Sequence, residues 1–221
     1  MSRSVKPIIT VASQATGPTT AVSGAAAPPP RRRNAAVRSR EHLLPGEVEQ
    51  LIEAARKRGG RYGHRDHTLL LLMYRHGLRA AEIAALRWDQ VDLPGGTLHV
   101  TRVKQGTPTT HPLRGPELRA LRRLQREQPE HGGYVFVTER GGPMAGRTVH
   151  HIVAEAGRAA QLAFPIHPHM LRHATGYSLA RQGTDTRALQ AYLGHRDIRR
   201  TVRYTERAPT RFKEFWKDEQ R

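Results

Sequence analysis

A short apolar run in the first half of the chain constrains the fold more than any other feature. Leu69–Met73 is the longest uninterrupted apolar stretch, and the segment Thr68–Arg75 is apolar on nearly all sides before Gly77. Such a segment predicts a helix buried in the centre of a protein, ended here by the glycine. Its length is far below the roughly 20 apolar residues that cross a bilayer. We therefore expect a core built around this helix, without a membrane span.

Segments with a single apolar face precede and follow this central helix. Helical spacing of apolar residues is found before Gly59-Gly60, in Ala80–Leu86, around Leu118–Leu124, and in 147–162, 169–181 and 185–193. Leu98–Val103 and Thr109–Leu113 are predicted strands joined around Gly106, and Tyr134–Val137 is a predicted third short strand. The expected fold class is α+β, mainly helical, with a small antiparallel sheet.

The first 40 residues differ in composition from the rest. They hold seven Lys and Arg and no acidic residue, and they are rich in Ala, Pro, Thr and Ser. Such a segment buries too little apolar surface to offset its ordering entropy, so residues 1–41 are expected to be a disordered basic arm. Arg31, Arg32 and Arg33 serve there either as a phosphate-binding arm or as part of a solubilising leader. Residues 42–221 are expected to form one domain with a C-terminal amphipathic tail.

Charge and cysteine content limit the classes of partner and site that this protein can have. The formal net charge is +18 and the sequence pI is about 11.4, which predicts a polyanionic partner. Nucleic acid is the default partner, and an anionic membrane surface is the weaker alternative. The absence of Cys excludes disulfides, thiolate metal sites and a Cys nucleophile. The N-terminus has no secretory-type apolar segment, so we expect a cytoplasmic protein.

Arg, His and Tyr side chains carry the chemistry that the sequence offers. The glycine-rich nucleotide-binding motifs and the nucleophile elbow are missing, which removes the signatures of nucleotide hydrolysis and acyl transfer. The chain has instead His169–His173, Leu193–His195 and Tyr204, with Arg79 shortly after Gly77. Two guanidiniums can bind the non-bridging oxygens of a phosphodiester. A tyrosine hydroxyl can attack phosphorus while a histidine takes its proton.

These residues resemble the tyrosine recombinase (phage integrase) family. The stretch His169–Tyr204 is similar to the family's H-x-L-R-H, L-G-H and Y motifs in type and spacing, and Gly77–Ile83 is similar to its first-arginine motif. The resemblance covers about residues 42–216. Within the family it is strongest to the fimbrial phase-variation invertases, which are also short chains. The segments that carry this similarity are Tyr74–Gly77, His111–Arg114, His167–His173 and Ile198–Thr205.

The resemblance implies a site-specific DNA recombinase, which breaks and rejoins DNA through a 3′-phosphotyrosyl intermediate to invert, integrate or excise a segment. The implied catalytic residues are Arg79, Lys104, His169, Arg172, His195 and Tyr204. Tyr204 would be the nucleophile, and Arg79 and Arg172 would bind the scissile phosphate. Lys104 would protonate the leaving 5′-oxygen. His169 would assist proton transfer with Tyr204, and His195 would donate a hydrogen bond to a phosphate oxygen.

The resemblance also implies supporting residues and partners. Glu82, one helical turn after Arg79, would hold its guanidinium, and His173 is expected to pack or hydrogen-bond beneath Arg172. Neither ATP nor a metal or other cofactor is expected, because the covalent intermediate keeps the phosphodiester energy and the cationic side chains replace a metal. The implied partners are double-stranded DNA and further copies of the chain, as a tetramer on two sites. The expected location is the cytoplasm, in association with the nucleoid.

Two other functions fit the same residue types. One is a non-catalytic DNA-binding regulator on the same fold, which would have no need of the full set of catalytic residues. The other is a type IB topoisomerase-like activity, which the H-x-L-R-H and L-G-H motifs disfavour. Tyr177 and Tyr192 are rival tyrosines, but both fall in helical patterns on expected core faces. The pairs His64/His67 and His167/His169 lack nearby partners at metal-ligand spacing.

Overall fold

Helices dominate the computed structural model, which describes residues 40–58, 60, 62–103, 106–128, 132–206 and 208. All of these belong to one unit, residues 34–221. The helices are α1 (Pro45–Lys57), α2 (Gly63–His76), α3 (Ala80–Ala84), α4 (Gly115–Glu127), α5 (Gly146–Ala159), α6 (Pro168–Arg181), α7 (Thr186–Leu193) and α8 (Arg199–Thr205). A 3₁₀ turn, η2 (Trp88–Gln90), precedes the strands β1 (Val91–Asp92), β2 (Thr97–Val100) and β3 (Thr109–Pro112). The predicted fold class is confirmed.

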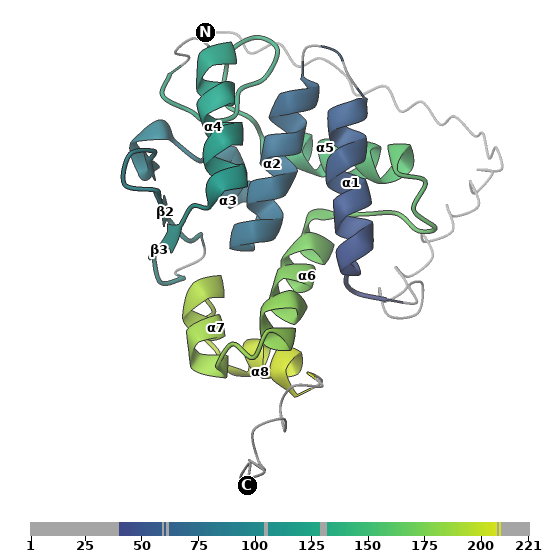
Figure 1. Cartoon of the computed structure of the whole chain (residues 1–221), viewed down its shortest axis with the longest axis vertical. Helices are drawn as coiled ribbons and strands as arrows, with labels where there is room; N and C mark the ends of the chain where they lie inside the picture. The colour runs from purple at the N-terminus through teal and green to yellow at the C-terminus, as the bar shows by residue number, and fades with distance from the viewer. Residues whose placement is uncertain are drawn as a thin grey trace, which may run out of the picture. The chain divides into compact units, whose positions relative to one another are not determined.

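Helix α2 is the centre of the core, as predicted. Figure 1 shows it between α1 and α4, and it also contacts α6. Leu69, Leu70 and Leu72 are completely buried, and each contributes about 1.5–3 kcal/mol through removal of its side chain from water. The helix ends at Gly77, whose left-handed φ of 59° a residue with a side chain rarely adopts. This turn sends the chain directly into α3.

The sheet contains the predicted hairpin but not the predicted third strand. Its order is β1-β2-β3, antiparallel throughout, with Leu98 opposite His111. The prediction of a strand at 134–137 is wrong: Tyr134 forms a single bridge with Arg87, and Val137 forms one with Pro143. The two ends of this apolar segment pair with different parts of the chain, so no continuous ladder forms.

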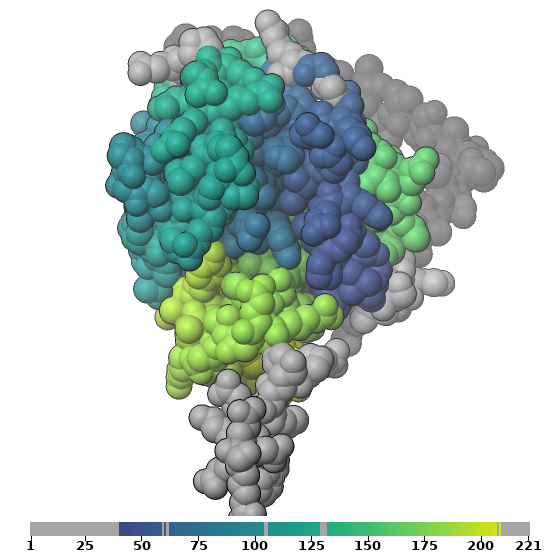
Figure 2. Space-filling model, in the orientation of Figure 1, coloured from purple at the N-terminus to yellow at the C-terminus, as the bar shows by residue number. Residues whose placement is uncertain are grey.

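The C-terminal helices build a second, smaller apolar cluster beside the main core. Its buried residues are Ala180, Leu189, Leu193, Tyr204 and Ala208. Helix α6 links the clusters because it contacts α2 as well as α7 and α8. In Figure 2 the yellow-green surface of the C-terminal helices adjoins the blue surface of α1 and α2. Helix α8, which carries Tyr204, was not anticipated from the sequence.

Two predicted segments extend beyond the described part. Most of the expected basic arm, with Arg31–Arg33, lies outside the described residues, as do Phe212, Phe215 and Trp216 of the expected tail. Arg40 and Glu41, the last two residues of the expected arm, are described. Arg40 pairs with Glu47 at 2.5 Å, and Glu41 pairs with Arg203. None of the described helices is both long and apolar enough to cross a bilayer.

Candidate active site

Arg79 and Glu82 form an ion pair at the start of α3. Arg79 is the N-cap of this short helix, and its backbone N–H donates to Glu82 Oε2 at 2.9 Å. Its Nη1 lies 2.5 Å from Glu82 Oε1. Burial alone would raise the pKa of Glu82, but this backbone hydrogen bond and the guanidiniums of Arg102 and Arg79 bring it below its ordinary value. The carboxylate is therefore ionised at neutral pH and can orient Arg79.

Arg172 lies on α6 and joins the ends of two other helices. Its Nη1 donates to the carbonyl of Gly77, which follows α2, and its Nη2 donates to the carbonyl of Leu193, the last residue of α7, at 2.5 Å. The residue is 4% exposed. Burial, followed by repulsion from Arg79 and Arg102, lowers the pKa of Arg172 to about 9. The guanidinium still carries its charge at pH 7.

Tyr204 reaches this region from α8 and contacts a histidine of α6. Its hydroxyl shares a hydrogen bond of 2.8 Å with Nδ1 of His173. The ring of Tyr177 packs edge-on against the Tyr204 ring, with 5.0 Å between centroids. Burial raises the pKa of Tyr204, and the nearby charges of Arg172 and Arg203 act in the opposite sense. The phenol is protonated at neutral pH and needs a proton acceptor before it can act as a nucleophile.

The histidines around Tyr204 are held neutral. Burial and the charge of Arg203 lower the pKa of His173 to about 4. His195 stacks on the Tyr204 ring at 6.4 Å and shares a 2.9 Å hydrogen bond with the Thr201 hydroxyl. Burial and the charges of Arg172 and Arg79 lower its pKa to about 3. Neutral imidazoles can accept a proton or donate a hydrogen bond.

The other predicted site residues lie farther from Tyr204 or outside the described part of the chain. His169 is exposed on α6, and its ring centroid is 6.3 Å from that of His173. Lys104 and Arg31–Arg33 lie outside the described residues. His173, which was expected to pack or hydrogen-bond beneath Arg172, contacts the Tyr204 hydroxyl directly. Its place four residues after His169, on the same helix face, was the signal in the sequence.

The structure adds one residue that the sequence reasoning missed. Arg102 follows β2, and its guanidinium is buried against Glu82 at 3.0 Å. An arginine beside a hairpin turn ordinarily has a solvated side chain, so the sequence carried no signal for this contact. Arg79 and Arg102 thus pair with the Glu82 carboxylate, and Arg172 interacts electrostatically with both Glu82 and Tyr204.

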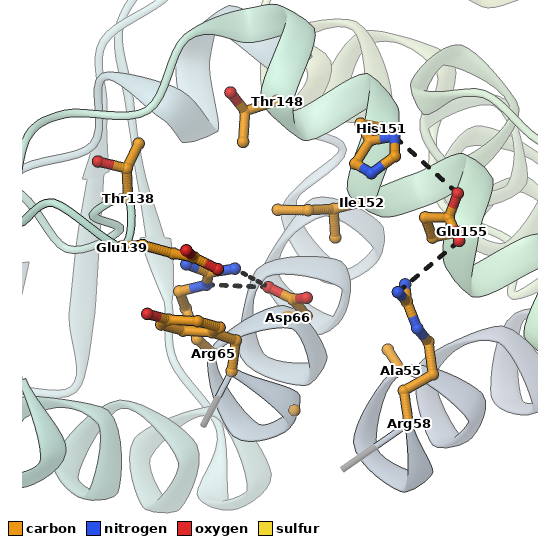
Figure 3. A pocket seen from close by; sticks show the side chains of 12 residues that line it. Ala55, Arg58, Arg65, Asp66, Thr138, Glu139, Thr148, His151, Ile152 and Glu155 are labelled. Carbon is orange, nitrogen blue, oxygen red and sulfur yellow. Dashed lines mark hydrogen bonds and ion pairs between the residues drawn. The ribbon is translucent and has the colours of Figure 1, made fainter. Parts of the chain in front are cut away.

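A separate cavity of about 400 Å³ is lined by none of the site residues described above. Figure 3 shows it between the end of α1, the start of α2 and α5, with an ion pair of 2.8 Å between Arg65 and Asp66. Arg58 and His151 both approach Glu155. Within the described residues, no cluster of three or more His, Asp or Glu side chains is arranged to hold a metal ion.

The fold and this set of side chains define a DNA strand transferase that uses a tyrosine. Residues 41–211 match the phage integrase family. The chain belongs to this family and is a site-specific tyrosine recombinase, as the sequence motifs predicted.

Similar proteins support the same assignment. The chain is 41% identical over 182 residues to the type 1 fimbriae regulatory protein FimE of Escherichia coli K12, covering 80% of this chain and 91% of FimE. It is 33% identical over 178 residues to tyrosine recombinase XerD of Pseudomonas putida KT2440, covering 78% of this chain and 59% of XerD. XerH site-specific recombinase, solved bound to difH substrate before cleavage, has the same fold at a TM-score of 0.68 and 21% identity, over 80% of this chain and 53% of XerH.

Proposed function

We propose that Tyr204 is the nucleophile that cleaves one strand of double-stranded DNA and forms a 3′-phosphotyrosyl bond. The observation that carries the proposal is the 2.8 Å hydrogen bond between the Tyr204 hydroxyl and the neutral imidazole of His173. The tyrosine oxygen attacks phosphorus and its proton passes to His173 Nδ1. The bond between phosphorus and the 5′-oxygen breaks, and Lys104 supplies the proton that makes the 5′-hydroxyl. His169, one helical turn before His173, assists the proton transfer.

The cationic side chains stabilise the charge that grows on the phosphate. Arg79 and Arg172 bind the non-bridging oxygens, and His195 donates a hydrogen bond to one of them. Glu82 aims Arg79 through the 2.5 Å contact between them. Because the phosphotyrosyl bond keeps the energy of the phosphodiester, rejoining needs no ATP. Neither a metal nor another cofactor is part of this mechanism.

Recombination exchanges strands between two sites, so we propose that four copies of the chain act together on two duplexes. Inversion is the outcome we favour, because the sequence motifs resemble those of the fimbrial phase-variation invertases and the similarity to a fimbriae regulatory protein, FimE, covers most of both chains. Residues 1–41 form an arm in which Arg31, Arg32 and Arg33 add phosphate contacts, and residues 42–221 form the catalytic domain. The protein works in the cytoplasm, at the nucleoid, where its DNA lies.

Covalent trapping tests the role of Tyr204. Nicked duplexes built from inverted repeats that flank the gene lose a short 5′-hydroxyl fragment after cleavage, so the adduct accumulates. Wild type, Tyr204→Phe and Tyr177→Phe are compared in EDTA without ATP on a denaturing gel. Tyr177 is the matched control, because its ring packs directly on that of Tyr204.

We expect an adduct with wild type and with Tyr177→Phe, and none with Tyr204→Phe. DNA affinity of Tyr204→Phe should stay close to that of wild type, because the substitution removes one hydroxyl from a buried ring. An adduct formed by Tyr204→Phe would show that another residue is the nucleophile. Native mass measurement of the trapped complex then tests the assembly: two duplexes with four chains support the tetramer.

A further inference from the structure

Arg102 is a buried charged side chain to which the mechanism above gives no task. Its guanidinium is inaccessible to solvent and lies 3.0 Å from Glu82 Oε2 through Nη1. Its Nη2 donates to the carbonyl of Tyr192 at 2.5 Å. The next residue, Val103, donates its backbone N–H to Glu82 Oε1 at 3.3 Å. Arg102 therefore connects the hairpin, the start of α3 and the end of α7.

The same contacts complete the environment of Glu82. One oxygen of its carboxylate accepts from the Arg79 backbone and from Arg102, and the other accepts from the Arg79 side chain and from Val103. Four donors in fixed positions leave the carboxylate little freedom to rotate. Loss of Arg102 would remove one of the two donors to Oε2 and loosen the carboxylate, and the Arg79 guanidinium would loosen with it, because the same carboxylate holds it.

The chain is shaped closely around the Arg102 side chain. A Cβ atom at Gly194 would lie 2.8 Å from Arg102 Cγ and 2.9 Å from its Nε, and one at Gly106 would lie 2.7 Å from Arg102 Cβ. Gly194 also has a left-handed φ of 63° and directly precedes His195. The turn that carries His195 therefore packs on the aliphatic stem of Arg102, while the tip of Arg102 holds the carbonyl of Tyr192.

The stability of the fold alone does not explain why Arg102 is buried against Glu82. A buried ion pair commonly contributes no more than apolar side chains of similar volume, because both charges must leave water. Arg102 is moreover buried close to Arg172, and its charge helps to lower the pKa of that residue. Among the described residues, the buried Nε of Arg102 has no hydrogen-bond partner. This costs free energy that a methionine stem in the same place would not incur.

We propose that Arg102 is a positioning residue: it fixes Glu82 so that Arg79 is aimed at the scissile phosphate, and it fixes the end of α7 that leads into His195. The inference rests on the proposed phosphotyrosyl chemistry of Tyr204. It concerns the binding of the charged phosphate and not the nucleophile itself.

Adduct formation on two matched suicide duplexes tests this role. One duplex has the natural phosphodiester at the scissile position, and the other has a methylphosphonate, which lacks the negative charge that Arg79 and Arg172 bind. The variants are Arg102→Met, which keeps the stem, and Arg102→Lys, which keeps the charge but loses the fork. The control is Arg65→Met, because Arg65 is another buried arginine, paired with Asp66 and bound to the Val137 carbonyl at 3.0 Å, away from the site.

We expect Arg102→Met to slow adduct formation on the phosphodiester by about 30- to 100-fold, the scale of an ångström-size misplacement. The loss on the methylphosphonate should be several-fold smaller, because less charge has to be stabilised there. Arg102→Lys should also lose more rate on the phosphodiester than on the methylphosphonate, but by a smaller factor. This variant tests the positioning role if Arg102→Met fails to fold. Arg65→Met should leave the ratio of the two rates at its wild-type value.

Two results would overturn the inference. Equal losses on both duplexes in the two Arg102 variants would mean that Arg102 only stabilises the fold. An unchanged ratio and rate in Arg102→Lys and Arg102→Met would mean that Glu82 and Arg79 keep their geometry without it. The absence of any adduct with wild type is a different failure, which removes the proposed function and this inference with it.

Discussion

The contact between Gly176 and the Tyr204 ring allows a quantitative test of how the proposed nucleophile is positioned. Gly176 lies in α6, and a Cβ atom added there would be 2.7–2.8 Å from three carbons of the ring. Ordinary contacts begin near 3.4 Å, so Gly176→Ala would push the ring away by about 0.7 Å. The hydroxyl would move with the ring and away from its 2.8 Å contact with His173.

The same substitution has opposing effects on stability. Alanine in place of glycine inside a helix raises the free energy of unfolding by about 1 kcal/mol, whereas overpacking lowers it by about 1–3 kcal/mol. The free energy of unfolding should therefore fall by at most about 2 kcal/mol, which lowers Tm by at most about 4–8 °C in a chain of this size. A displacement near 1 Å slows a positioned reaction by about 100-fold. We expect adduct formation to slow by roughly 20- to 100-fold at a temperature where the variant is fully folded.

Gly157 in α5 offers a matched control. A Cβ atom there would lie 2.6 Å from Cγ1 of Ile166, so Gly157→Ala combines a similar helix gain with a similar clash, in the core and not against the nucleophile. Adduct formation on the suicide duplex and thermal unfolding are measured for both variants. Gly157→Ala should change Tm with little change in rate. A folded Gly176→Ala protein that cleaves within about threefold of wild type would refute the idea that this packing positions Tyr204.

Two further predictions concern stability. The pKa of His173 is about 4 and that of His195 about 3 in the folded protein, against 6.5 as the ordinary value, so between pH 4 and 6.5 the unfolded chain binds more protons. The free energy of unfolding should therefore fall as the pH drops from 6.5 towards 4, and urea titrations at pH 7, 6 and 5 that give equal values would contradict these pKa shifts. Asp185 caps α7 by accepting from the backbone of Arg187 and Ala188. Asp185→Ala should lower the free energy of unfolding, measured by thermal unfolding, by about 1 kcal/mol, whereas Asp185→Asn should lower it much less.

The helices before α8 were predictable because each leaves a periodic apolar pattern and a clear end, whereas α8 was not anticipated. Gly77 ends α2 as the sequence indicated, and Asp185, the first residue of the predicted segment 185–193, caps α7. The failed strand at 134–137 shows the limit of such patterns. Three buried apolar residues in a row fit a strand, but whether a ladder forms depends on which distant segments pass beside them. Here Arg87 and Pro143 each supply a single bridge.

Side-chain partners across the site were harder to predict than the elements that carry them. The motif spacing indicated His169, Arg172 and Tyr204, and the resemblance assigned proton transfer with Tyr204 to His169, but the histidine that contacts the phenol is His173. That choice depends on how α8 packs against α6, and the packing brings His173 to the hydroxyl. Arg102 was missed for a related reason. Arginine is ordinarily a surface residue, and Arg102 is buried because Glu82 and the end of α7 pack against the hairpin.

The charge balance of the site follows from how its arginines are held. Arg172 is held by the carbonyls of Gly77 and Leu193, and Arg102 uses the carbonyl of Tyr192. Helix ends leave such carbonyls without partners in the helix, so α2 and α7 can fix guanidiniums without neutralising them. Glu82 is the carboxylate that contacts Arg79 and Arg102. Three guanidiniums and one carboxylate leave a formal charge of +2 in a region of low solvent access. In the proposed mechanism a phosphodiester carries one negative charge and gains more on the way to the pentavalent transition state, so this surplus would stabilise the transition state more than the bound substrate.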